Sequence, residues 1–86
     1  MPEISRFLGL VIRMYFLDHQ PPHFHVSYGD HEAVLGISPP RLLTGQLPRR
    51  ALALATEWAT LHEVALLFNW RRLRANQSPV RVPPLE

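Results

Sequence analysis

Apolar and polar residues alternate along the first half of the chain, from Ile4 to about Thr44, and Gly, Pro and Asp interrupt the alternation at short intervals. A period of two is that of a β-strand with one buried face, and the interruptions are typical of turns. This half of the chain predicts a small antiparallel sheet of four or five short strands. The candidate strands are Ile4–Leu8, Leu10–Leu17, His23–Tyr28, Glu32–Ile37 and Arg41–Thr44.

Two of the interruptions make definite predictions about the sheet. Gly29 and Asp30 tolerate the positive-φ conformations that tight turns require, so a turn is expected from Tyr28 to His31. Pro39 and Pro40 cannot donate hydrogen bonds to a strand ladder. The last strand is therefore expected to lie at an edge of the sheet or to be irregular.

The pattern changes after Gly45. Pro48 suits the first turn of a helix, and from there to about Ala75 no Gly or Pro occurs while Ala, Leu, Arg and Glu dominate. One long helix is predicted. Its apolar residues recur every three or four positions, the spacing of a stripe that covers one face of a sheet. The stripe comprises Ala51, Leu54, Trp58, Leu61, Ala65 and Phe68, with Leu52, Ala55, Ala59, Leu66 and Leu73 beside it.

The predicted fold is therefore α+β, with a small antiparallel sheet packed against one long C-terminal helix. A chain of 86 residues is too short for two cores, so we expect one domain over residues 1–76. Residues 77–86 contain three prolines and are predicted to form a tail. Val64 and Leu67 lie off the apolar stripe of the helix, which indicates a homodimer or another partner on its outer face.

Composition narrows the classes of function. The chain has no cysteine, which excludes disulfides and thiolate chemistry and leaves histidine and carboxylate as metal ligands. The net charge of +2 is too small for a protein whose whole surface binds nucleic acid. No basic leader and no apolar run of roughly 18 residues is present. We expect a cytoplasmic protein without a membrane partner.

Chemically capable side chains gather in one part of the predicted sheet. Leu10, Ile12, Met14 and Phe16 share the core face of the second strand, which leaves Arg13 and Tyr15 on the other face because successive side chains alternate. By the same alternation His23 and His25 point away from the core in the third strand. If these two strands pair, the face opposite the helix collects Arg13, Tyr15, His23 and His25.

Metal binding is one interpretation of this group. Imidazoles at positions i and i+2 of a strand can converge on one ion such as zinc, so His23 and His25 are candidate ligands, with His19, Asp18 or His31 as a third. None of the standard metal-binding spacings, such as His-Glu-x-x-His, is present.

Two further interpretations need no cofactor. In the first, His23 and His25 act as acid and base on a phosphodiester, Arg13 stabilises the developing charge and Tyr15 positions the substrate. In the second, the group is structural: Asp18 caps a turn and the histidines are hydrogen-bonded on a half-exposed face.

Four segments resemble a small bacterial family catalogued as domain of unknown function 4160. They are Met1–Phe7, Asp18–Val26 with its Pro-Pro-His-Phe-His-Val run, Gly45–Leu52 and Glu57–His62. The family's name assigns no activity. The resemblance implies that the protein is one half of a two-gene cassette of the toxin-antitoxin kind and is encoded beside a small cognate protein.

The leading expectation is accordingly a toxin of such a module, with RNA as substrate and with His23, His25, Arg13 and Tyr15 as catalytic residues. An alternative is a non-catalytic, antitoxin-like protein that binds or regulates a partner. A further alternative is a metal-dependent hydrolase. A helix-turn-helix regulator is not expected, because one long helix offers no recognition helix.

Overall fold

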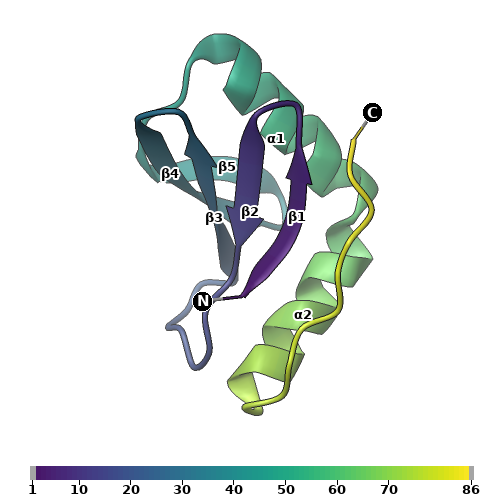
Figure 1. The fold of residues 1–86 in the computed structure, drawn as a ribbon. Helices are drawn as coiled ribbons and strands as arrows, with labels where there is room; N and C mark the ends of the chain where they lie inside the picture. Colours follow the sequence, from purple (N-terminus) through teal and green to yellow (C-terminus); the bar gives the residue numbers. More distant parts are fainter. Residues whose placement is uncertain (1, 86) are drawn as a thin grey trace.

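Five antiparallel strands form one sheet in which the strand order follows the chain order (Figure 1). The computed structural model describes residues 2–85. The strands are β1 Glu3–Phe7, β2 Leu10–Arg13, β3 His23–Tyr28, β4 His31–Ile37 and β5 Pro40–Gly45, and the helices are α1 Arg49–Leu61 and α2 Glu63–Arg74. The predicted α+β class and antiparallel sheet are confirmed.

Short turns join most of the strands, as the sequence predicts. Gly29 has a φ of 57° in the tight turn between β3 and β4, and Gly9 has a φ of 86° between β1 and β2. Positive φ at these positions favours glycine because no Cβ clashes with the backbone. The fifth strand begins at Pro40 and lies at an edge of the sheet, which confirms the expectation drawn from the two prolines.

The second strand is shorter than predicted and ends at Arg13 instead of Leu17. The chain leaves the sheet there because its next backbone groups bond elsewhere. The Met14 N–H donates to the carbonyl of Pro2, and the Leu17 N–H donates to the carbonyl of Leu73 in α2. Phe16, which alternation placed in the core, is consequently 42% exposed.

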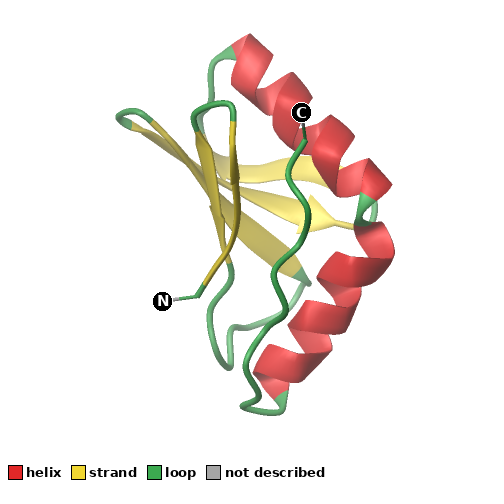
Figure 2. Ribbon diagram, turned by 45° about the vertical axis from the view of Figure 1, so that its right-hand side comes forward, coloured by secondary structure: helices red, strands yellow, loops and turns green. Residues whose placement is uncertain are grey.

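The prediction of one long helix is wrong. Two helices follow one another with a bend of 83°, and His62 between them has a non-helical φ of −118° and ψ of 27°. A straight helix from Arg49 to Arg74 would be about 39 Å long at 1.5 Å per residue. The Cα trace of the whole molecule is only 33 Å in its longest dimension. The bend keeps α1 on the face of the small sheet and carries α2 around the end of the sheet (Figure 2).

The core lies between the sheet and the two helices. Small residues at Ala51, Ala55 and Ala59 are fully buried and let α1 approach the strands closely. Trp58 fills the centre, with its ring centroid 5.4 Å from that of Phe7 and 5.8 Å from that of Phe24. Leu61 and Phe68 belong to the stripe predicted for a straight helix, yet they are 65% and 47% exposed. The bend turns them outward, and the buried residues of α2 are Leu66, Asn69, Trp70 and Leu73.

The residues predicted as a tail pack on the domain. Val82 is buried, and its N–H donates to the carbonyl of Ile4 over 2.8 Å. The indole N–H of Trp58 donates to the carbonyl of Pro83, and the amide of Asn69 exchanges two hydrogen bonds with the backbone of Val80. The C-terminal segment therefore lies between β1 and the helices and closes that side of the core (Figure 2).

Neither helix of residues 2–85 is by itself long and apolar enough to cross a membrane. Taken together across their bend, the two helices reach the length and apolar composition that a membrane span requires.

Candidate functional site

The outer face of the sheet carries a polar cleft of about 480 Å³. Neighbouring strands each contribute side chains to this cleft. Arg13 of β2 pairs with His25 of β3, and His25 pairs with Val34 of β4. The guanidinium of Arg13 donates to the hydroxyl of Ser27 over 3.1 Å. The remaining polar side chains of the lining are Tyr15, Glu32 and Thr44.

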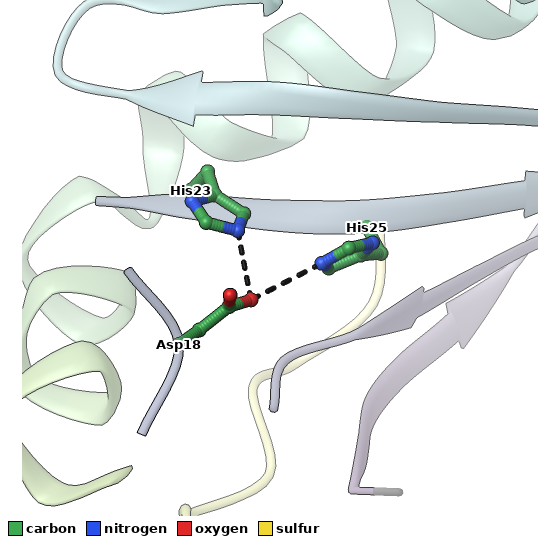
Figure 3. Close-up of side chains that lie close together, drawn as sticks. All are labelled: Asp18, His23 and His25. Atoms are coloured by element: carbon green, nitrogen blue, oxygen red, sulfur yellow. Dashed lines mark hydrogen bonds and ion pairs between the residues drawn. The ribbon is translucent and has the colours of Figure 1, made fainter. Parts of the chain in front are cut away.

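Three side chains converge at one end of β3. The carboxylate oxygen Oδ2 of Asp18 lies 2.8 Å from Nε2 of His23 and 3.4 Å from Nε2 of His25. We call Asp18, His23 and His25 the triad (Figure 3). The ligand atoms of the triad all lie within 4.8 Å of one another. His25 also lines the cleft, so the triad and the cleft share this residue.

The position of Asp18 depends on the second helix. The backbone next to it is held by the hydrogen bond from Leu17 to Leu73, and Arg74 donates to the carbonyl of Asp18 itself. The His19 N–H donates to Oδ1 of the Asp18 carboxylate over 3.0 Å, which leaves Oδ2 to the histidines. These hydrogen bonds aim the carboxylate of Asp18 at β3.

His23 departs from the prediction that it lies on an exposed face. Only 5% of it is exposed, and its ring centroid lies 5.1 Å from that of Trp70. Trp70 belongs to α2, which the bend carries around the end of the sheet, so a straight helix would not have covered this position. The burial removes His23 from direct contact with a substrate.

His25 and Tyr15 remain accessible from the cleft. The side chain of His25 is 31% exposed, and its ring meets that of Tyr15 edge-on with centroids 4.4 Å apart. Arg13, Tyr15 and His25 are therefore neighbours on the outer face, as alternation predicted.

Hydrogen bonds and burial fix the charges of the triad. Burial opposes ionisation of Asp18, but the hydrogen bond from the His19 N–H and the neighbouring His25 and His23 side chains outweigh it and hold the pKa of this carboxyl below its usual value. Burial lowers the pKa of His25, against the raising effect of Asp18. At neutral pH the two groups are thus a carboxylate and a neutral imidazole, the forms that accept a proton or bind a cation.

The other candidate ligands lie outside the triad. His19 has an exposed side chain, with its ring centroid 5.8 Å from that of His23. His31 begins β4 and is exposed. His62 lies at the bend between the helices with its ring 5.6 Å from that of Trp58.

Sequence reasoning missed two kinds of residue at the site. Trp70 and Arg74 contact the triad only because α2 changes direction, and no local pattern signals that change. Ser27, Glu32 and Thr44 could have been found by extending the alternation of β3 to its paired strands.

A family model described as "Domain of unknown function (DUF4160)" matches residues 9–71. The matched segment contains the triad, Arg13, Tyr15 and Trp70. The comparison with curated proteins and that with solved structures found no match.

Proposed function

Since the chain belongs to the DUF4160 family, whose description names no activity, we propose a function from the geometry of the site. The protein is a phosphodiester hydrolase that cleaves RNA and acts as the toxin of a bacterial two-gene module. One observation carries the proposal: His25 belongs both to the triad and to a cleft that Arg13 and Tyr15 line.

Cleavage of RNA needs three things that this arrangement offers. The attacking hydroxyl must lose a proton, and the triad provides a carboxylate and imidazoles for that purpose. The phosphate needs a cation that stays charged, and Arg13 at the cleft supplies a guanidinium suited to two phosphate oxygens. The phenol of Tyr15 lies against His25, where it can orient a ribose or a base.

The proposal changes the role of one predicted residue. His23 was expected to form an acid-base pair with His25, but it is buried and both of its ring nitrogens already face oxygen atoms of the protein. We assign His23 to positioning Asp18. His25, Arg13 and Tyr15 keep the roles of catalytic residues.

Cleavage of a fluorescently labelled RNA by the purified protein tests this function. His25→Ala and Arg13→Ala should each reduce the rate by on the order of 100-fold, as expected for the loss of a proton-transfer group or of a charge that stabilises the transition state. His31→Ala and Arg49→Ala are matched controls, because both side chains are exposed and neither lines the cleft. Equal rates for His25→Ala and the unaltered protein, or no cleavage by the folded protein, would refute the proposal.

A second candidate function has its own observation. Leu61, Val64 and Phe68 are exposed at the bend between the helices, where they line a hollow of about 510 Å³ with Ala65 and others. An exposed apolar surface of this kind favours binding of another protein. The expected partner is the small cognate protein of the module or a second copy of the chain.

Co-purification with the protein encoded alongside tests partner binding. Val64→Glu should abolish binding of that protein if the bend is the interface, whereas Glu57→Gln, an exposed change elsewhere on the first helix, should not. Stoichiometric binding that is blocked by Val64→Glu, together with no effect of His25→Ala on RNA or on growth, would favour a non-catalytic partner over a toxin.

A further inference from the structure

The triad has the spacing of ligands around a single ion. Ligand atoms at 2.0–2.2 Å from a tetrahedral ion lie roughly 3.4 Å from one another. Oδ2 of Asp18 lies 2.8 Å and 3.4 Å from the Nε2 atoms of His23 and His25, and no two of the three ligand atoms are more than 4.8 Å apart. One ion could bind all three atoms once the two Nε2 atoms, which lie within 4.8 Å of each other, move to that separation.

The hydrogen bonds of His23 leave an electron pair facing the carboxylate. Nδ1 of this ring lies 2.7 Å from the carbonyl oxygen of Pro21, which can only accept, so Nδ1 carries the hydrogen. The other nitrogen of the neutral ring, Nε2, then has a lone pair, and it points at Oδ2 of Asp18, which also only accepts. A positive species is required between them.

The same oxygen also faces His25. Oδ2 of Asp18 is the hydrogen-bond partner of Nε2 on both rings. In the absence of an ion, His23 must carry a second proton and His25 must hold its hydrogen on Nε2 to satisfy these two contacts. A metal ion satisfies the carboxylate oxygen and the lone pairs of both nitrogens at once.

The surroundings of the triad match those of a metal site. Histidines that bind metal donate their second ring N–H to a carboxylate or a backbone carbonyl, which fixes the tautomer and the ring. His23 does this with Pro21, and Trp70 covers its ring. The backbone of Asp18 is anchored to α2 by Arg74. Two of the three ligands are therefore held in place before any ion binds.

We propose that Asp18, His23 and His25 bind one divalent transition-metal ion of the zinc class, through Oδ2 and the two Nε2 atoms. Two imidazoles and one carboxylate suit zinc and its neighbours better than magnesium or calcium, which prefer sets of oxygen ligands. Three protein ligands leave a coordination position for water or substrate, the arrangement of catalytic zinc sites. His25 puts that position beside the cleft.

The ion would deepen the function proposed above: Nε2 of His25 would then be a ligand instead of a proton acceptor, and the bound ion would activate the attacking hydroxyl by lowering its pKa. Its catalytic role rests on that function, whereas its binding does not.

Isothermal titration of Zn²⁺ into untagged, chelator-treated protein tests the site. We expect one ion per chain and a rise in melting temperature on binding. Asp18→Asn and His25→Gln, which preserve side-chain size, should weaken binding by about 100-fold or more, the upper range found when metal-site groups are altered. His31→Ala and His19→Ala should bind zinc like the unaltered protein, and circular dichroism shows whether each variant is folded.

Several outcomes would overturn the inference. Folded protein that binds none of Zn²⁺, Co²⁺, Ni²⁺ and Mn²⁺ has no such site, and equal affinity in His25→Gln and the unaltered protein places the ion elsewhere. RNA cleavage at an undiminished rate by protein that binds no metal would refute the metal site and leave the hydrolase intact. Stoichiometric zinc binding without RNA cleavage would uphold the site and refute the hydrolase.

Discussion

Ser5 carries a hydroxyl that is buried without a hydrogen-bond partner, the one side-chain atom of this kind among residues 2–85. It lies on β1, where the pairing with β2 shifts register, and only 1% of the residue is exposed. A buried polar atom without a partner lowers stability by about 1–3 kcal/mol. The hydroxyl therefore opposes folding.

Ser5→Ala should raise the free energy of unfolding by about 1 kcal/mol, because it removes the unpaired oxygen and leaves a cavity no larger than that atom. Urea denaturation measures the change. Ser27→Ala is the matched control: its hydroxyl accepts a hydrogen bond from Arg13, so its loss should not stabilise the protein. A loss of stability in Ser5→Ala as large as that in Ser27→Ala would contradict the argument.

At the scale of residues, sequence predicted the members of the site better than their exposure. Alternation alone placed Arg13, Tyr15 and His25 on one face: the strand register pairs Arg13 with His25, and the ring of Tyr15, beyond the end of β2, contacts that of His25. It could not place His23 correctly, because the exposure of that ring is decided by Trp70, 47 positions later in the chain. Asp18 was a candidate ligand, but its direction depends on hydrogen bonds to α2.

The bend between the helices decides which apolar side chains enter the core. Leu66 is fully buried after the bend, whereas Phe68, two residues later, is 47% exposed and has the guanidinium of Arg72 5.6 Å from its ring centre. The stripe predicted for a straight helix would have buried both side chains. The two positions thus report on the bend directly.

Leu66→Ala should lower the free energy of unfolding by about 2–5 kcal/mol, the range for a large buried side chain replaced by alanine. Phe68→Ala should lower it by less than about 1 kcal/mol, since much of that ring already contacts solvent. Chemical denaturation of both variants makes the comparison. A loss of stability in Phe68→Ala as large as that in Leu66→Ala would contradict the bend.

At the scale of elements, local patterns predicted the strands and not the bend. The strands carry a period of two and are bounded by Gly, Pro and Asp, so their ends follow from nearby residues. Residues 49–74 contain no Gly or Pro, and every residue near His62 is compatible with a helix. The helix breaks because the sheet beneath it is short, and the size of the sheet is a property of the assembled fold.

At the scale of the whole molecule, Glu3 joins the two ends of the described chain. Its carboxylate accepts hydrogen bonds from Arg6 of β1 and from Arg81 of the C-terminal segment. The hydrogen bond from Arg6 is the main cause that holds the pKa of Glu3 below its usual value, with Arg81 adding to it. A carboxyl with a lowered pKa in the folded state stabilises that state above the pKa of the unfolded chain. The contribution is lost as pH falls through the folded pKa.

Glu3→Gln should therefore lower the melting temperature at pH 7 by no more than a few degrees, as for exposed ion pairs of a small domain. As pH falls through the lowered pKa of the folded state, the difference from the unaltered protein should shrink and vanish, because the carboxylate is then protonated in both states. Thermal unfolding followed by circular dichroism at several pH values measures this. Glu57→Gln is the control, and a difference that persists unchanged at pH 3 would rule out the ion pair as its cause.

The C-terminal segment shows what a composition-based prediction leaves out at this scale. Three prolines predicted a tail, and residues 77–85 lie in no helix or strand. Its packing is directed by Trp58, Asn69 and Ile4, whose polar groups meet it from three different elements. No local pattern in residues 77–86 records those partners.

The same segment covers one edge of the sheet and leaves the other edge exposed. Beside β1 the approach is occupied by the chain from Val80 to Pro83, whereas β5 is exposed along nearly its whole length and carries Leu42 and Leu43 at its surface. An unpaired margin is a template for adding another strand. Among residues 2–85, β5 is the one edge strand left free. Two molecules that pair through β5 would therefore leave no free edge for a third. Growth of this sheet by strand addition ends at a pair and cannot continue into a fibre.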